Sequence, residues 1–335
     1  MIHEQPLVDL GIPTLSEVLD PIALAQHLRV ASWAPWNKKA VDEVHVRVLR
    51  HHRRQRCTLE IGVRTEKSWH FLIGKVYQKD RPDVFRAMEE IQEAGFGPRD
   101  EFSIPQPIAY LPWLRLLLQE KVEGPLAKEI FKTGDNQNRA AAAERCAWWL
   151  ARFHALGPKA GLVFDSRCYY LSELRERSRR IRKLKGPCAD KAARLLRGLE
   201  DAAASLRPVE MRAGHGSYSP AQLILADGRT VTFDWDGYDV ADPARDVGRF
   251  LYALRRWGSD QLGSIRVLDG AAQVFLETYL AVGPPDAKKN LCFFEAAACL
   301  KRAKHSLDQS VPHLQDKTEE MLDEGLRVLE AGATR

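Results

Sequence analysis

The residues whose types and spacing could do chemistry lie in three neighbouring segments, His215–Leu225, Val231–Asp236 and Asp242–Asp246. Two short strands with polar tips, followed by a loop and a helix, can bring a polar loop close to an acidic strand end. Asp234 ends the second strand, and its carboxylate oxygens are hard ligands that suit Mg²⁺. The alternative for Asp234 is a turn aspartate that bonds its own backbone. Asp236 either assists at the metal or caps the turn.

This pattern closely resembles the catalytic core of the aminoglycoside phosphotransferase and choline kinase family, a branch of the protein-kinase-like fold. That family has His-Gly-Asp, an Asn five residues after the Asp, and Asp-Phe/Trp at the end of the next strand. The resemblance makes Asp234 the metal-binding aspartate and places Gln222 at the Asn position, as a second metal ligand. It places Ser217 at the position of the catalytic base. The cofactors it implies are Mg²⁺ and either ATP or GTP.

Ser217 is the departure from the family pattern with the largest chemical consequence. The aspartate of the family accepts the proton of the substrate hydroxyl or orients that hydroxyl, and serine cannot act as an anionic base near neutral pH. General-base assistance is worth ~10²–10⁴-fold. Much of phosphoryl-transfer catalysis is positioning and charge neutralisation. The loss of the base therefore predicts a slow reaction, which need not be abolished. Gln222 keeps an amide oxygen, one methylene further out.

Two residues near the loop are expected to support it rather than to react. The resemblance implies that His215 packs into the core and orients the loop, and that Asp246 braces the loop by hydrogen bonds. A helix-terminal acid stabilised by the helix dipole would explain Asp246 equally well. His154, on the apolar face of the expected helix 140–156, is predicted to be a core histidine that bonds nearby backbone.

The N-terminal part of the chain holds the candidate nucleotide contacts. Lys75 lies in an apolar strand, where an inward lysine needs an anionic partner and an outward one keeps its head in solvent. The resemblance makes it the lysine that contacts nucleotide phosphates. Glu89 and Glu90 are weak candidates for its helix partner, because the family pattern puts that acid nearer the helix start. The backbone of Glu120 and Val122 stands where the family binds a purine edge.

Two basic clusters stand out against a mild net charge of +5. The turn at His51–Arg56 has no glycine. Its arginine side chains either replace the backbone N–H groups that would otherwise contact phosphate, or the turn is an exposed basic loop. The segment Arg175–Lys185 is a solvated helix face, an anion site near the cleft, or a nucleic-acid contact. Sparse aromatics make nucleic acid the weakest choice. A cationic acceptor would want an acidic pocket, so this segment favours a sugar or an anionic metabolite over an aminoglycoside.

The periodicity of the chain predicts the elements that position these residues. We expect an α+β, two-lobed protein-kinase-like fold, with a small antiparallel β-rich nucleotide lobe at 1–120 and a larger helical lobe at 121–335. Strands are expected at 44–49, 57–63, 69–77, 108–110 and 114–119, and a hairpin at 221–235. Helices are expected at 23–34, 83–94, 140–156, 171–184, 189–206, 244–257, 260–282 and 290–331.

Composition narrows the class of protein. With 45% hydrophobic and 28% charged residues, the chain is typical of a soluble globular protein. It has no apolar run of the ~18 residues that a membrane span needs. It also has no signal-peptide pattern, so we expect a cytoplasmic protein. Its six cysteines include no Cys-x-x-Cys pair, which argues against zinc.

Three functions remain open from the sequence. The first is a small-molecule phosphotransferase that uses ATP or GTP with Mg²⁺ and has an altered catalytic loop. The second is a pseudokinase that binds nucleotide or a protein partner and transfers nothing, which Ser217 favours. The third, nucleotidyl transfer with reversed nucleotide, has no positive support in the residues. The acceptor and the oligomeric state cannot be derived from the sequence.

Overall fold

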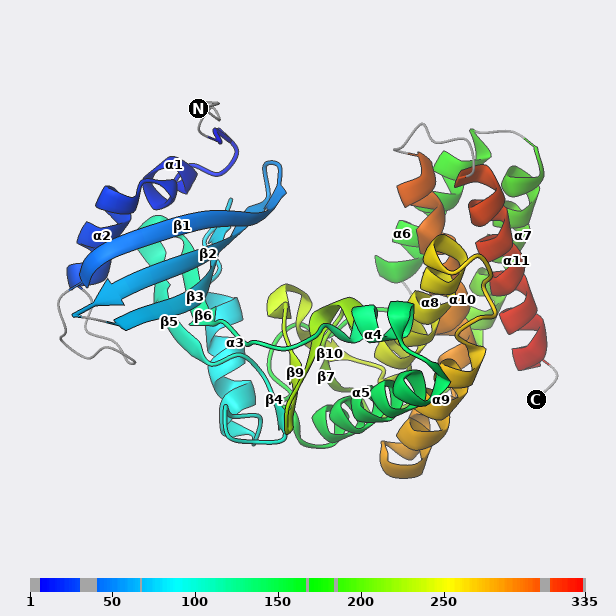
Figure 1. Ribbon diagram of the computed structural model, residues 1–335. Coiled ribbons are helices and arrows are strands. Elements are labelled where there is room, and N and C mark those ends of the chain that lie inside the picture. The colour runs from blue at the N-terminus through cyan, green and yellow to red at the C-terminus, as the bar shows by residue number, and fades with distance from the viewer. Residues whose placement is uncertain are drawn as a thin grey trace. The chain divides into compact units, whose positions relative to one another are not determined.

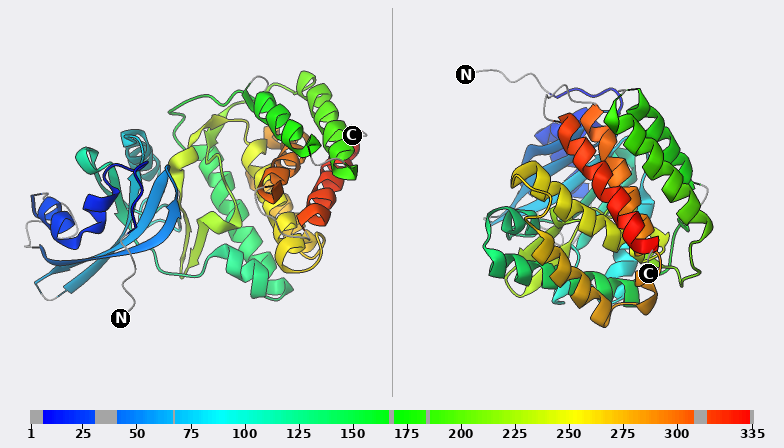
Figure 2. Two further views of the ribbon diagram at one scale, coloured as in Figure 1. Left: turned by 90° about the horizontal axis from the view of Figure 1, so that it is seen from above. Right: turned by 90° about the vertical axis from the view of Figure 1, so that its right-hand side faces the viewer.

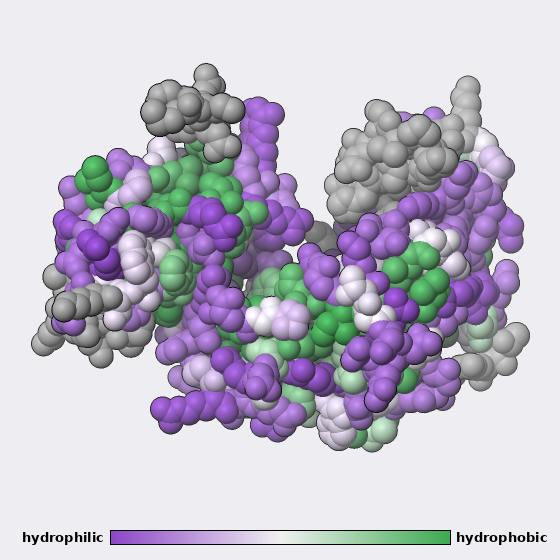
Figure 3. Space-filling model, in the orientation of Figure 1, coloured by the Kyte–Doolittle hydropathy of each residue, from purple (hydrophilic) through white to green (hydrophobic). Residues whose placement is uncertain are grey.

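The computed structural model describes residues 7–30, 41–66, 68–166, 169–183, 186–307 and 314–333. The chain forms two compact units, Met1–Glu123 and Gly124–Arg335. No helix within these described ranges is long and apolar enough to cross a membrane. The face drawn in Figure 3 is covered largely by hydrophilic residues, interrupted by smaller hydrophobic areas.

The first unit is built on a five-stranded antiparallel sheet with the order β1-β2-β3-β6-β5. Helices α1 and α2 cover one face of the sheet in Figure 1, and α3 lies on the other side. Apolar residues of α1, α2 and alternate strand positions form one buried core between them. The elements are α1 (Leu15–Leu19), α2 (Pro21–Val30), β1 (Val41–His52), β2 (Arg56–Thr65), β3 (Ser68–Tyr77), α3 (Pro82–Glu93), β4 (Phe102–Ser103), β5 (Pro107–Leu111), η1 (Pro112–Leu114) and β6 (Leu116–Glu120).

The second unit is mostly helical and carries two small pairs of strands, β7 with β10 and β8 with β9. Figures 1 and 2 show α7, α10 and α11 packed side by side. The elements are α4 (Ala127–Thr133), α5 (Asn136–Leu156), α6 (Tyr169–Arg182), α7 (Pro187–Ala204), β7 (Arg212–Gly214), η2 (Pro220–Gln222), β8 (Leu223–Ala226), β9 (Arg229–Thr232), η3 (Trp235–Gly237), β10 (Asp239–Ala241), α8 (Ala244–Gln261), α9 (Asp269–Val282), η4 (Pro285–Lys288), α10 (Leu291–Leu307) and α11 (Leu314–Ala333).

Helix α5 is the scaffold on which the site of the second unit is assembled. Its start is fixed by the Asp135 side chain, which accepts the backbone N–H of Asn138 at 2.7 Å, as an N-cap should. Its buried face presents Trp149 and Phe153, whose rings pack against Trp235, the residue that follows Asp234. The buried face of this helix therefore packs against the residue next to Asp234.

The structure departs from the expected elements at several places. The strands β1 and β2 continue through His51, His52 and Arg56, so the basic turn shrinks to residues 53–55. The strand expected at 114–119 begins later, because Pro112 starts a 3₁₀ turn. The helix expected at 260–282 begins only at Asp269, since α8 ends before Gly263, whose φ is +82°. The helix expected at 290–331 is interrupted between α10 and α11, where residues 308–313 lie outside the described ranges, as do residues 31–34 of the expected first helix.

Candidate active site

The loop that starts at His215 and the loop that starts at Asp234 are held together by a strand pair that the sequence did not predict. Strand β7 leads into the first loop and β10 leads out of the second, and Gly214 pairs with Asp239. Gly216 has φ +74°, and a Cβ added there would lie 2.1 Å from the carbonyl oxygen of Gly237. Only glycine allows this close approach, so Gly216 sets the spacing between the two loops.

Asp246, in the first turn of α8, holds the first loop by its backbone. Its Oδ2 accepts the N–H of His215 at 2.7 Å and its Oδ1 accepts the N–H of Gly216 at 3.1 Å. Nε2 of His154 lies 3.6 Å from the same carboxylate, and Nδ1 of His154 meets the Tyr279 hydroxyl at 2.7 Å, not backbone as expected. Burial acts to raise the pKa of Asp246, but His154 and Arg245 outweigh it and hold this pKa well below its usual range.

The hydrogen bonds of His215 determine its tautomer and the direction of the Ser217 hydroxyl. Nε2 of His215 is 3.1 Å from the carbonyl oxygen of Phe233, so it must carry the proton. Nδ1 is then an acceptor, and it receives the Ser217 Oγ–H at 3.1 Å and the Ser217 N–H at 3.3 Å. Burial lowers the pKa of His215. The ring is therefore neutral, and the oxygen of half-buried Ser217 can accept a further hydrogen bond.

Asp234 has a backbone conformation that few residues other than glycine adopt, with φ +75° and ψ 59°. The next residue, Trp235, is fully buried and donates its indole N–H to the carbonyl of Thr232 at 3.2 Å. The buried indole and its hydrogen bond hold the backbone of Asp234 in this strained conformation, as is common at functional sites. The half-buried Asp234 carboxyl is thus presented at the strand end, with Asp236 two residues on in the same 3₁₀ turn.

Gln222 is brought opposite the acidic turn by the β8–β9 hairpin. Its carbonyl oxygen accepts the N–H of Phe233 at 3.0 Å, one residue before Asp234. Its side-chain Oε1 accepts the hydroxyl of Ser219, so one lone pair of the candidate ligand is already used. Within the described ranges, no three His, Cys, Asp or Glu side chains cluster as a metal site. One carboxylate and one amide oxygen nevertheless suit Mg²⁺, which takes few protein ligands and completes its shell with phosphate and water oxygens.

In the first unit, Lys75 is a buried charge in the middle of the sheet. Its strand position lies between Thr58 of β2 and Leu117 of β6, and the residue is 4% exposed. Leu72 and Val76 belong to the core under α1 and α2. Because side chains alternate along a strand, Lys75 lies on the opposite face. This burial is inconsistent with the alternative left open by the sequence, in which the ammonium group of Lys75 lies in solvent.

The other residues predicted for the nucleotide site have mixed surroundings. Glu89 and Glu90 are both exposed on α3, whose buried face is apolar, and this exposure favours neither as a partner of buried Lys75. The backbone N–H of Glu120 donates to the carbonyl of Gln106 at 2.8 Å. A purine contact at this position therefore needs the carbonyl of Glu120 and the N–H of Val122, which follows the strand in an irregular segment.

The short basic turn between β1 and β2 already binds an anion, the carboxylate of Asp9. Oδ2 of Asp9 accepts the Arg54 N–H at 2.7 Å and lies 2.8 Å from Nε2 of His51, while Oδ1 accepts the N–H of Gly11 at 2.9 Å. The backbone bond from Arg54 is the main reason that the pKa of Asp9 falls to about 2. This partner could not be predicted from the residues of the turn, because it comes from the segment before α1.

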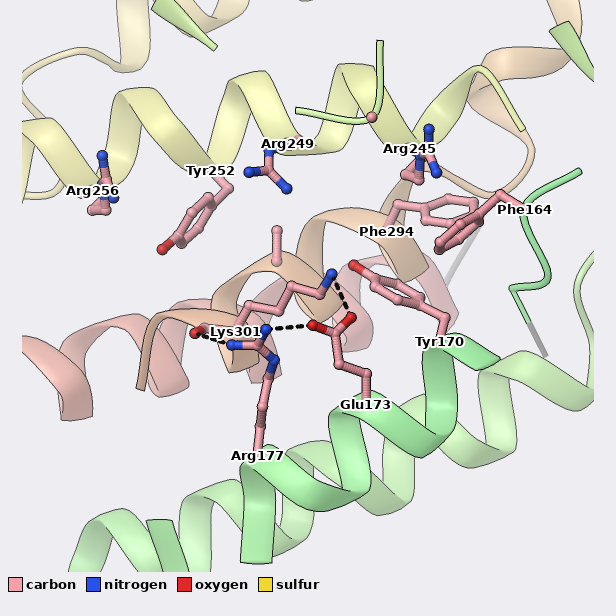
Figure 4. A pocket seen from close by; sticks show the side chains of 12 residues that line it. Phe164, Tyr170, Glu173, Arg177, Arg245, Arg249, Tyr252, Arg256, Phe294 and Lys301 are labelled. Atoms are coloured by element: carbon pink, nitrogen blue, oxygen red, sulfur yellow. Dashed lines mark hydrogen bonds and ion pairs between the residues drawn. The ribbon is translucent and has the colours of Figure 1, made fainter. Parts of the chain in front are cut away.

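The second basic cluster separates into surface residues and one residue of a cavity. Arg175, Arg179 and Arg180 are exposed and pair with glutamates on the surface of α6 and α7. Arg177 instead lines a cavity of about 250 Å³, which also touches Gly216 of the first loop. Residues 184 and 185 of the predicted cluster lie outside the described ranges. Figure 4 shows this cavity between α6, α8 and α10.

The sequence did not single out most of the residues that line this cavity, among them Arg249, Lys301 and Tyr170. Arg249 lies three residues after Asp246, about one helical turn, so its position on α8 could have been noticed from that spacing. Lys301 and Tyr170 come from helices far apart in the sequence, and only the packing of α6 against α10 brings them together.

Comparisons with known proteins identify the family and the fold. The chain matches the model of the phosphotransferase enzyme family, APH, over residues 71–282, which is more than half of its 335 residues. No curated protein sequence matches it. The β1–β2 turn and its Asp9 contact lie before the matched region.

Several solved structures are similar along most of their length. A choline/ethanolamine kinase family protein from Mesorhizobium loti has a TM-score of 0.58 at 14% identity, covering 95% of this chain and 94% of its own. A glucosamine kinase in complex with glucosamine, ADP and inorganic phosphate has 0.64 at 13%, covering 93% and 87%. Spectinomycin phosphotransferase APH(9)-Ia, in complex with ADP and spectinomycin, has 0.60 at 12%, covering 99% and 100%. At these identities the likeness establishes the fold, and the α+β protein-kinase-like fold predicted from the sequence is confirmed. With the family model matched across the loops at His215 and Asp234, this chain belongs to the phosphotransferase enzyme family.

Proposed function

We propose that this protein transfers the terminal phosphoryl group of ATP or GTP, with Mg²⁺, to a hydroxyl of a small molecule. The observation that carries the proposal is the pair of bonds from the Asp246 carboxylate to the backbone of His215 and Gly216. These bonds fix the loop that bears Ser217 to α8, and the bond from Nε2 of His215 to the carbonyl of Phe233 holds that loop beside the turn that bears Asp234. A loop fixed in this way is useful where a hydroxyl and a phosphate must be held in line.

The roles of the residues follow from their positions. Asp234 and Gln222 would hold Mg²⁺, which when bound neutralises the charge on the phosphate oxygens. Lys75 would add a second positive charge at the phosphates, and the backbone of Glu120 and Val122 would bind the purine.

Ser217 would orient the acceptor hydroxyl rather than remove its proton. Its own hydroxyl proton points to Nδ1 of His215, so its oxygen can accept a hydrogen bond from the acceptor hydroxyl. No carboxylate stands at this position to take the proton. We therefore propose a slow enzyme, which relies on positioning and charge neutralisation.

The similar structures and the basic cluster narrow the chemical class of the acceptor. The neighbours include proteins solved with glucosamine and with spectinomycin, so a hydroxyl-bearing small molecule fits the fold. The basic lining beside Gly216 disfavours a polycationic aminoglycoside and favours a sugar or an anionic metabolite.

A pseudokinase is the second candidate, and two observations favour it. The base position is a serine, and Oε1 of Gln222 already accepts the hydroxyl of Ser219. A protein with these features could keep a nucleotide site and transfer nothing.

A thermal-shift panel of ATP and GTP, each with and without Mg²⁺, tests the nucleotide site that both candidates share. We expect a Mg²⁺-dependent rise in Tm that Asp234→Asn removes. Asp227→Asn is the matched control, because Asp227 lies exposed in the turn at the other end of the same hairpin. The absence of any shift with millimolar purine nucleotide would contradict both candidates. Single-turnover hydrolysis then separates enzyme from pseudokinase.

A further inference from the structure

The cavity beside the first loop has an unusual charge. Of the side chains that line it, five are cationic and one, Glu173, is anionic. Gly216 forms part of its wall, next to Ser217, so a molecule bound inside lies beside the position where the acceptor hydroxyl is needed. Figure 4 shows Arg249 and Tyr252 of α8 across the cavity from Glu173 and Arg177 of α6, with Lys301 of α10 nearby.

Three of the five cations have partners within the protein. Both terminal guanidinium nitrogens of Arg245 donate to the Asp239 carboxylate, and the guanidinium carbon lies 4.2 Å from the centre of the Phe164 ring. Glu173 is shared, because Nζ of Lys301 lies 2.9 Å from its Oε2 and Arg177 bonds its Oε1. Asp246 adds a third carboxylate beside Arg245, so the charges of these three cations are balanced within the protein. Burial lowers the pKa of Lys301 to about 8 against the pull of Glu173, so this side chain is charged near neutral pH.

The other two cations, Arg249 and Arg256 of α8, have no acidic partner among the residues that the structure describes. Both are only partly exposed, and Nε of Arg256 is buried without a hydrogen bond in the same set of residues. After burial itself, the charge of Arg249 is one of the influences that lower the pKa of His215, which places this arginine in electrostatic reach of the first loop. Partly buried guanidinium groups without a counter-charge are costly unless an anion binds them.

The size of the cavity limits the ligand. At about 250 Å³ it is smaller than the ~300–1,000 Å³ typical of pockets for drug-sized ligands. A volume of this size matches one sugar ring better than a molecule of several rings. The aromatic walls, Phe164, Tyr170, Tyr252 and Phe294, suit the apolar face of such a ring.

We infer that this cavity is the acceptor site and that the acceptor is a single-ring or shorter polyol that carries a phosphate or carboxylate group. Arg249 binds that group with its planar fork, the geometry that matches both anions, and Arg256 and Lys301 add positive charge. The hydroxyl to be phosphorylated then lies toward Gly216 and Ser217. This inference rests on the proposed function and specifies its acceptor.

Isothermal titration of the full chain without nucleotide tests the inference directly. The probes are glucose 6-phosphate and gluconate as the two anionic sources, glucose as the neutral match and glucosamine as the cationic match. We expect at least one anion to bind and to bind more tightly than both other sugars. Arg249→Gln should weaken that binding by about tenfold or more, as for the loss of one charge-assisted hydrogen bond. The control Arg179→Gln, on the surface of α6, should not change it.

The comparison among wild-type ligands keeps the test independent of whether Arg249→Gln folds, and Arg256→Gln serves as a second variant. Failure of both anions to bind, equal or tighter binding of glucose or glucosamine, or an unchanged affinity in a folded Arg249→Gln would overturn the inference. Transfer assays separate the two proposals. Phosphorylation of a neutral or cationic sugar in preference to the anions would keep the proposed function and reject the acceptor class. Selective anion binding without any transfer would keep the anion site and reject the function.

Discussion

The fully buried carboxylate of Asp246 accepts a hydrogen bond from the backbone N–H of His215 at 2.7 Å. This bond links the first turn of α8 to the loop that carries Ser217, and the same carboxylate also accepts the next N–H along the chain. The relationship explains why a buried acid is kept beside a neutral histidine, because its charge satisfies backbone donors rather than the imidazole of His215.

Asp246→Ala should destabilise the protein strongly. The two backbone donors would lose their acceptor in the interior, at a cost of ~1–3 kcal/mol each. The free energy of unfolding in urea measures the loss, with the exposed Asp227→Asn as control. The folded-state pKa of Asp246 is below its unfolded value, so its contribution is present above the unfolded pKa and disappears as the pH falls. A loss well below ~1 kcal/mol at neutral pH would show that the loop does not depend on this bond.

Asp9→Asn should loosen the turn between β1 and β2. The carboxylate accepts backbone N–H groups on both sides and meets His51, and an amide cannot replace all of these bonds. Hydrogen exchange at the Arg54 amide should become several-fold faster, while Asp42→Asn on the exposed side of β1 leaves it unchanged. In the wild type the protection should persist to low pH and fade near the Asp9 pKa of about 2, because the carboxylate is protonated only below it. Equal exchange in Asp9→Asn and wild type would contradict the contact.

Binding of an anionic acceptor should weaken as the pH rises through the Lys301 pKa of about 8. Lys301 is charged below this value and neutral above it, and the groups that surround it are Glu173, Arg177, Arg249 and Tyr170. The Kd of gluconate, whose charge is constant in this interval, should rise several-fold between about pH 7 and about pH 9. Lys301→Met should remove the slope. The same slope in both proteins would assign it to another group.

Much of the fold could be predicted because its signals are local. The alternating strands around Lys75 and the alanine-rich helix α5 are strong periodic patterns, and they match the structure within a few residues. The interruption before α9 was missed, because a glycine within a run of helix-forming residues does not by itself show where a helix stops. Strands β7 and β10 were also missed, since each has only three residues and depends on the other for its pairing.

The candidate site was predictable where it follows one motif and not where it depends on packing. Asp234, Gln222, Ser217 and Asp246 could be proposed because they lie at fixed spacings in one continuous region. The partners of Ser217 and Gln222, which are His215 Nδ1 and the Ser219 hydroxyl, are set by side-chain rotamers that no spacing encodes. The cationic cavity is formed by the packing of three helices, so only one part of it, the basic cluster on α6, could be noticed in the sequence.

The most direct test of the account is the rate of single-turnover ATP hydrolysis by wild type and by Ser217→Asp, with Mg²⁺ in both. If the site is intact and only the base is missing, the new carboxylate should raise the rate by ~10²-fold or more. Ser217→Asn controls for size, and a melting curve with nucleotide shows that each variant folds and binds. We expect slow but measurable wild-type turnover and a faster Ser217→Asp. A folded, nucleotide-binding Ser217→Asp that is slower than wild type would contradict the proposed role of Ser217.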